Sequence, residues 1–110
     1  MTNPKQLAVW AALAAVLAAG AALADDPMKV YQKDKVFTKT DVHVQKGGTI
    51  VFANADTVMH NIYSVSPGNA FEIKTQLPGK ESAVVFKNPG VAEVRCAIHP
   101  GMKLQVTVDP

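Results

Sequence analysis

Cysteine is almost absent from this sequence, since Cys96 is the one cysteine among 110 residues. A chain with a single cysteine cannot form an internal disulfide, and a free exposed thiol would be a liability after export, so Cys96 should be buried or occupied. A strong excess of charge is also lacking, because 11 basic and 9 acidic residues leave a formal net charge of +2. The lysines are scattered and form no run, and we therefore expect no nucleic-acid partner.

Charge is missing altogether from a stretch near the N-terminus. Residues 7–24 are uncharged, rich in Ala, Leu and Val, and end in Ala22-Leu23-Ala24, which is an A-x-A-like cleavage site. This pattern predicts a signal peptide over residues 1–24 that directs export to the periplasm and is cleaved, leaving no membrane segment. A retained membrane anchor is the alternative, since about 18 apolar residues can span a bilayer. Residues 25–110 then form one small domain.

Helical periodicity is lacking after Ala24, where no stretch keeps an apolar repeat over three turns. Short strand-like segments separated by turn residues are present instead, at residues 41–45, 49–53, 58–65, 82–86, 91–96 and 102–108. Ala92, Val94 and Cys96 fall on one face of their segment, which points Cys96 towards the core. We predict an all-β fold, a Greek-key β-sandwich of seven or eight strands.

Four side chains are suited to hold a soft metal ion. Cys96, His99 and Met102 form a C-x2-H-x2-M cluster that a single loop can wrap around one ion, and His60 lies far upstream near a strand end. One thiolate, two imidazoles and one thioether are the donors of a type 1 copper centre. We expect one copper ion, with Met102 as the long axial ligand. A backbone N–H on the sulfur and fixed partners for the free ring nitrogens should support it, and Asn61 is the candidate.

Each of these residues also has a plainer interpretation. Met102 alone would be a core residue and Cys96 a buried thiol, while Cys96 with His99 could be a nucleophile and its base. His43, on the polar face of its segment, is interpreted as a surface residue. The main functional alternative is a copper-handling protein that stores, delivers or senses copper with the same ligands. The exposed Met-rich or His-rich tracts that would favour this alternative do not occur in residues 25–110.

The ordered series of motifs resembles the cupredoxins, the small blue copper proteins such as plastocyanin, pseudoazurin and amicyanin. The resemblance covers residues 36–108. Its elements are GGTIVFAN at residues 47–54, the N-x-D-x3-H-N segment at residues 54–61, Leu77-Pro78-Gly79, Phe86, Pro89-Gly90 and CAIHPGM at residues 96–102. The short spacing between the last two donors is similar to that of amicyanin. The aromatic residues that many cupredoxins have before the cysteine are lacking in GVAEVRC at residues 90–96.

The cupredoxin resemblance implies a periplasmic one-electron carrier that docks transiently with redox proteins. On this basis we expect a monomer that is not an enzyme by itself and has no small-molecule substrate. The resemblance also implies that His99 lies in an apolar patch through which the electron leaves, with Pro100 and Gly101 as patch residues. It further implies that the backbone N–H of Asn61 donates a hydrogen bond to the Cys96 sulfur.

Overall fold

The computed structural model describes residues 27–110, so the predicted signal peptide at residues 1–24 lies outside the described part. Residues 27–110 contain no helix, and hence none long and apolar enough to cross a membrane. They form nine strands: β1 (Met28–Lys33), β2 (Val36–Phe37), β3 (Asp41–Gln45), β4 (Gly48–Asn54), β5 (His60–Ser64), β6 (Phe71–Gln76), β7 (Glu81–Phe86), β8 (Gly90–Cys96) and β9 (Lys103–Asp109). The all-β prediction is confirmed. The nine strands exceed the predicted seven or eight, and the shortest of them, β2, has only two residues.

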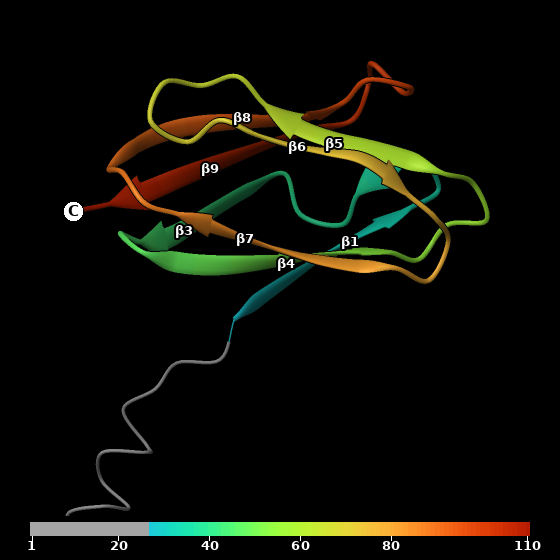
Figure 1. The fold of residues 1–110 in the computed structure, drawn as a ribbon, viewed down its shortest axis with the longest axis horizontal. Coiled ribbons are helices and arrows are strands. Elements are labelled where there is room, and N and C mark those ends of the chain that lie inside the picture. The colour runs from blue at the N-terminus through green and yellow to red at the C-terminus, as the bar shows by residue number, and fades with distance from the viewer. Residues whose placement is uncertain (1–26) are drawn as a thin grey trace, which may run out of the picture.

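The strands form two sheets that pack as a sandwich. One sheet has the order β2-β1-β4-β7 and the other the order β3-β9-β8-β5-β6. Figure 1 shows β5, β6 and β8 in one layer and β1, β4 and β7 in the other. Two neighbouring pairs are parallel, β1 with β4 and β3 with β9, whereas the other pairs are antiparallel. Both sheets are therefore mixed.

The core consists of the inward-facing residues of both sheets. On β8, Ala92, Val94 and Cys96 are buried while Val91 and Glu93 are exposed, as the alternation predicts. The same period of two holds on β9, where residues 104, 106 and 108 are buried. Fifteen buried residues make up one continuous cluster: Val30, Phe37, Val42, Val44, Ile50, Phe52, Ile62, Phe86, Ala92, Val94, Cys96, Met102, Leu104, Val106 and Val108. This cluster includes two of the predicted metal donors.

A tight hairpin joins β1 to β2. The register pairs Lys33 with Val36, which leaves Asp34 and Lys35 as a two-residue loop. Both loop residues have left-handed backbone angles, with φ of 54° and 59°. Two consecutive positive φ values are typical of the type I′ turn, which matches the twist of a hairpin. The turn therefore holds two non-glycine residues in a conformation that L side chains disfavour.

The strand register brings two distant loops to one end of the sandwich. β4 ends at Asn54, and the chain then passes through residues 55–59 into His60, the first residue of β5. β8 ends at Cys96, and residues 97–102 lead into β9. Because Ile62 of β5 is paired with Cys96 of β8, both loops lie beside each other. Figure 1 shows them at the end of the sandwich opposite the C-terminus.

Candidate metal centre

Cys96 and His60 meet through the pairing of β5 with β8. Cys96 is the last residue of β8 and faces inward, with 2% of its surface exposed. His60 begins β5 and is completely buried. Its Nδ1 lies 3.7 Å from the Cys96 Sγ. The structure thus joins the upstream histidine to the C-terminal cluster, as the sequence predicted.

His99 completes a group of three donors. Its Nδ1 lies 3.8 Å from the Cys96 Sγ and 3.2 Å from the His60 Nδ1. The ligand atoms of His60, Cys96 and His99 all lie within 4.8 Å of one another. Among residues 27–110 this is the group of histidine, cysteine and acidic side chains that could hold a metal ion. His99 is half-buried, so this histidine is the donor nearest to solvent.

The loop between β8 and β9 has a hydrogen bond at each end. The Ala97 N–H donates to the Asn61 carbonyl oxygen at 3.1 Å, which ties the start of the loop to β5. The Met102 N–H donates to the His99 carbonyl oxygen at 3.0 Å, which closes a turn between these two residues. The Met102 side chain is completely buried within the core cluster. The loop therefore returns a thioether to the interior three residues after the half-buried His99.

The backbone of Asn61 contacts the sulfur directly. Its N–H donates a hydrogen bond to the Cys96 Sγ at 3.3 Å, the geometry that the resemblance implied. A donated hydrogen bond stabilises negative charge on sulfur, and such contacts tune metal–thiolate centres. Asn61 is not, however, the partner of the free His60 ring nitrogen.

That partner is Asp56, which sequence reasoning did not assign to this role. The His60 Nε2 donates to the Asp56 Oδ2 at 2.8 Å, and the Asp56 side chain is only 8% exposed. Burial acts to raise the pKa of the Asp56 carboxyl, but hydrogen bonds from the Lys35 N–H, His60 and the Asp34 N–H outweigh it and lower the pKa. The position of Asp56, four residues before His60, was the sequence signal that could have indicated this contact.

Asn54 organises the loop that carries His60. Its Nδ2 donates to the carbonyl oxygens of Val58, at 2.9 Å, and Gln76, at 2.8 Å. Its Oδ1 accepts a hydrogen bond from the Asp56 N–H at 2.9 Å. One buried amide side chain therefore sets both the width of the loop and the position of Asp56. This explains why the strand before the first histidine ends in an amide residue.

Exposed apolar side chains accompany the half-buried His99. Pro100 and Gly101, the predicted patch residues, are exposed. The residues before the two histidine donors, His60 and His99, are also apolar and exposed, with 42% of Met59 and 45% of Ile98 accessible. Sequence reasoning did not include these two residues in the patch.

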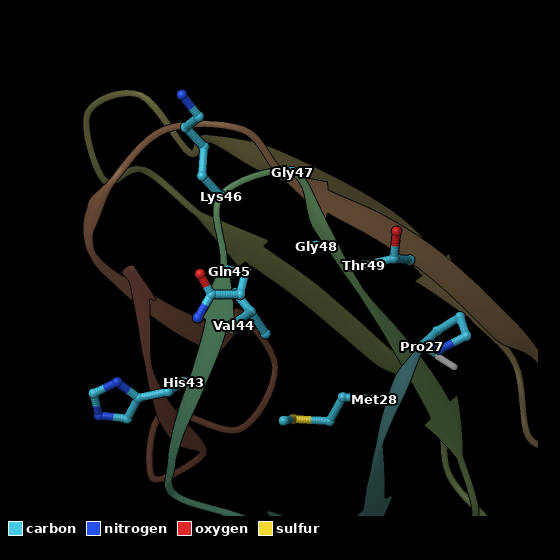
Figure 2. A pocket seen from close by; sticks show the side chains of 9 residues that line it. All are labelled: Pro27, Met28, His43, Val44, Gln45, Lys46, Gly47, Gly48 and Thr49. Atoms are coloured by element: carbon cyan, nitrogen blue, oxygen red, sulfur yellow. The ribbon is translucent and has the colours of Figure 1, made fainter. Parts of the chain in front are cut away.

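The remaining histidine lies elsewhere. His43 is exposed on β3, in agreement with its interpretation as a surface residue, and its Nδ1 lies 3.3 Å from the Asp109 carboxylate. It borders a surface hollow lined by residues 27–28 and 43–49. Figure 2 shows Met28 extending from β1 towards β3 in this hollow, and His43 pointing away from it. The hollow is formed around the start of β4, whereas the donor group follows the end of β4.

The chemistry of the donor group fits a copper ion. Donor atoms that each lie about 2.0–2.3 Å from a shared metal ion stand about 3–4 Å apart, and the three distances here fall in that range. Because the His60 Nε2 proton is donated to Asp56, the Nδ1 of the same ring presents a lone pair to the group. A sulfur with two imidazole nitrogens is a combination that suits copper in both oxidation states.

Solved structures with similar folds are copper proteins. A copper-containing nitrite reductase from Thermus scotoductus SA-01 matches with a TM-score of 0.73 and 23% identity over 80% of this chain, which spans only 23% of the reductase chain. A reduced Cu(I) form of an amicyanin variant matches with a TM-score of 0.70 and 23% identity, covering 81% of this chain and 88% of that one. A purple cupredoxin from Nitrosopumilus maritimus has a TM-score of 0.66 and 23% identity, covering 74% of this chain and 99% of its own. No curated protein matches.

A family comparison covers nearly the whole described sandwich. Residues 24–109 match the model of copper binding proteins of the plastocyanin/azurin family. The copper cofactor predicted from the sequence is thus confirmed, with His60, Cys96, His99 and Met102 arranged as a type 1 copper site. The match extends over both loops of the site and over the strands that bring them together. The chain therefore belongs to the plastocyanin/azurin family of copper-binding proteins.

Proposed function

We propose that the protein carries single electrons between redox proteins, by means of one copper ion held at the described end of the sandwich. The observation that carries this proposal is the convergence of Cys96 Sγ with two histidine Nδ1 atoms, all within 4.8 Å. Copper, when bound, alternates between Cu(I) and Cu(II) and so supplies a place for one electron. The protein's own residues then have to hold donors that suit both states.

The four side chains divide this task according to their chemistry. Cys96, His60, His99 and Met102 would hold the ion, and this combination of donors is typical of blue copper sites. Soft thiolate and thioether donors favour Cu(I), whereas imidazole serves both oxidation states. The mixed set is therefore a compromise that leaves neither state strongly preferred.

The scaffold limits how far the donors can move. His60 and Cys96 lie on neighbouring strands and are buried, and the Asn61 N–H donates a hydrogen bond to the sulfur. Asn54 and Asp56 restrain the loop before His60. A site whose geometry changes little on reduction transfers electrons with a low reorganisation barrier. Rigidity is thus a functional property of this end of the sandwich.

We propose that the electron leaves the copper site through His99. It is the half-buried donor, and Pro100, Gly101, Met59 and Ile98 offer an exposed and largely apolar surface around it. A small apolar contact of this kind suits weak, short-lived docking of a redox partner. The nearly balanced charge of the chain gives little long-range electrostatic steering.

The predicted signal peptide indicates where in the cell the protein works. We propose that residues 1–24 direct the chain to the periplasm and are cleaved there, so that residues 25–110 work as a monomer. Two findings support this boundary: the family match starts at residue 24, and the first strand starts at Met28. The protein then acts by passing electrons on and is not an enzyme by itself.

The test is spectroscopic. Residues 25–110 are purified, loaded with Cu(II) and examined by visible absorption and electron paramagnetic resonance. We expect an intense thiolate-to-copper band, narrow hyperfine splitting and reversible one-electron reduction. Cys96→Ser should abolish the band, and His60→Ala should weaken copper binding. His43→Ala is the matched control, because His43 lies on the surface away from the donor group, and should leave the spectrum unchanged. A spectrum without the thiolate band would refute the proposal.

A further inference from the structure

The Asp56 carboxylate joins two parts of the chain that are far apart in sequence. Its Oδ1 accepts the Asp34 N–H at 2.8 Å, and its Oδ2 accepts both the Lys35 N–H at 2.9 Å and the His60 Nε2 proton at 2.8 Å. Three donors therefore converge on a side chain that is only 8% exposed. Two of them belong to the turn between β1 and β2, and the third belongs to a copper ligand.

The turn supplies its two N–H groups because of its backbone conformation. Asp34 and Lys35 both have positive φ, and their N–H groups reach the two oxygens of one carboxylate. Charge-assisted hydrogen bonds of this kind are stronger than neutral ones. The Asp56 N–H is bound in turn by the Asn54 Oδ1. Asn54 thus restrains the backbone of Asp56, and the turn restrains its carboxylate, which also accepts the His60 proton.

We propose that Asp56 is the positioning residue of His60, and that the turn at residues 34–35 belongs to the support of the copper site through it. By accepting the Nε2 proton, Asp56 selects the ring tautomer that leaves Nδ1 free to bind the metal and sets the direction of its lone pair. The inference rests on the proposed function, in which His60 is a ligand. The Asp56–His60 contact itself involves only protein atoms.

The copper-free protein provides the first readout. Long-range ¹H–¹⁵N NMR of the wild-type protein at neutral pH should show His60 as the Nε2–H tautomer, with a slowly exchanging ring proton. In Asp56→Ala we expect a mixture of tautomers and a fast-exchanging ring proton, together with shifted Asp34 and Lys35 amide signals. Asp56→Asn keeps one acceptor oxygen and should lie between the two.

Copper binding provides the second readout. Loss of a carboxylate that supports a metal-binding histidine typically lowers metal affinity about 10–100-fold. We expect a decrease of this size in Asp56→Ala, measured by competition with a chelator of known affinity, and a smaller one in Asp56→Asn. Asp109→Asn is the matched control, because it removes the acid of the exposed His43–Asp109 pair, and should change neither readout.

Several outcomes would overturn the inference. A single Nε2–H tautomer retained in Asp56→Ala would do so, and so would a lowered copper affinity with an unchanged tautomer, which would indicate a purely structural role. Should Asp56→Ala not fold, as judged by circular dichroism, Asp56→Asn decides by the same two criteria. If the wild-type protein failed to give the thiolate band, the proposed electron-carrier function would fail. The tautomer of the copper-free protein would still decide the role of Asp56.

Discussion

Met102 is the donor whose contribution can be separated most easily from the others. It is completely buried and follows His99 in the same loop, so a change of its terminal atoms replaces the thioether while the side chains of Cys96, His60 and His99 stay the same. We expect Met102→Gln to retain copper and to have a lower reduction potential, because an amide oxygen favours Cu(II) over Cu(I). Cyclic voltammetry of the loaded protein measures the difference.

Met28→Gln is the control for this change. Met28 begins β1 and lines the hollow near the start of β4, away from the donor group. Its replacement should leave the potential unchanged. Equal potentials for wild type and Met102→Gln would show that the thioether is not an axial donor.

At the residue scale, the sequence was sufficient to predict the metal donors, but not all of the residues that hydrogen-bond to them. Copper chemistry restricts donors to a few residue types, so Cys96 and His99, with Met102 after them, formed a recognisable pattern. An aspartate in a loop has many ordinary explanations, so its position four residues before His60 was only a weak signal for the contact with His60 Nε2. The hydrogen bonds that Asp56 also accepts come from the β1–β2 turn, a part of the chain that is remote in sequence.

A substitution in the β1–β2 turn should be able to raise the free energy of unfolding. Left-handed backbone costs an L residue about 1–2 kcal/mol, whereas glycine adopts it freely but loses about 0.5–1 kcal/mol more chain entropy on folding. Lys35, with φ of 59°, is in this conformation. We therefore expect Lys35→Gly to raise the free energy of unfolding by about 0.5–1 kcal/mol. Urea denaturation of the copper-free protein measures this change.

Lys33→Gly serves as the opposite case. Lys33 is the last residue of β1 and is exposed, with ordinary strand backbone. Glycine there only adds entropy to the unfolded chain, so the variant should be less stable than wild type. If both glycine variants were destabilised alike, the strain assigned to residue 35 would be wrong.

Substitutions on β9 can test whether the alternation of buried and exposed residues determines the stability of the sandwich. Leu104 is completely buried in the core, and its neighbour Gln105 is exposed on the same strand. Leu104→Ala should lower the free energy of unfolding by about 2–5 kcal/mol, because it removes apolar contacts and leaves a cavity. Gln105→Ala should change it by no more than about 0.5 kcal/mol. Similar losses in both variants would contradict the assigned faces.

At the element scale, the predictable strands were those with a clean alternation of apolar and polar residues. β8 and β9 have this pattern and were predicted to within one residue. β1 was not singled out, since one of its two buried positions is Gln32, which breaks the apolar repeat. β6 was not predicted either. It lies at a sheet edge, where Phe71 and Ile73 are only half-buried, so few apolar residues mark it as a strand in the sequence.

At the scale of the whole molecule, most of the core consists of side chains that are not metal donors. The fifteen-residue cluster extends along both sheets, and the loops of the site are tied by protein hydrogen bonds such as those of Asn54. We expect the copper-free protein to keep the far-ultraviolet circular dichroism spectrum of the loaded form. Copper should raise the melting temperature, because it binds the folded chain more tightly than the unfolded one. Differential scanning calorimetry with and without copper gives the shift, and an unfolded copper-free chain would contradict it.

Overall architecture was the most predictable level, because turn residues and short alternating segments restrict a small chain to a sandwich. Which strands become neighbours was not predictable in detail. The parallel pairs β1–β4 and β3–β9 join segments remote in sequence, and no local pattern in residues 28–33 specifies a partner at residues 50–54.

The β3–β9 pair has a consequence for how the protein acquires its metal. β3 is hydrogen-bonded within its sheet to β9 alone, although more than 50 residues separate the two strands in the sequence. β3 therefore gains its partner in the sheet only after residues 103–109 have been made, and such remote pairings form slowly. β9 also pairs with β8, the strand that ends in Cys96. A donor group that depends on this pairing can take up copper only after residues 103–109 are in place.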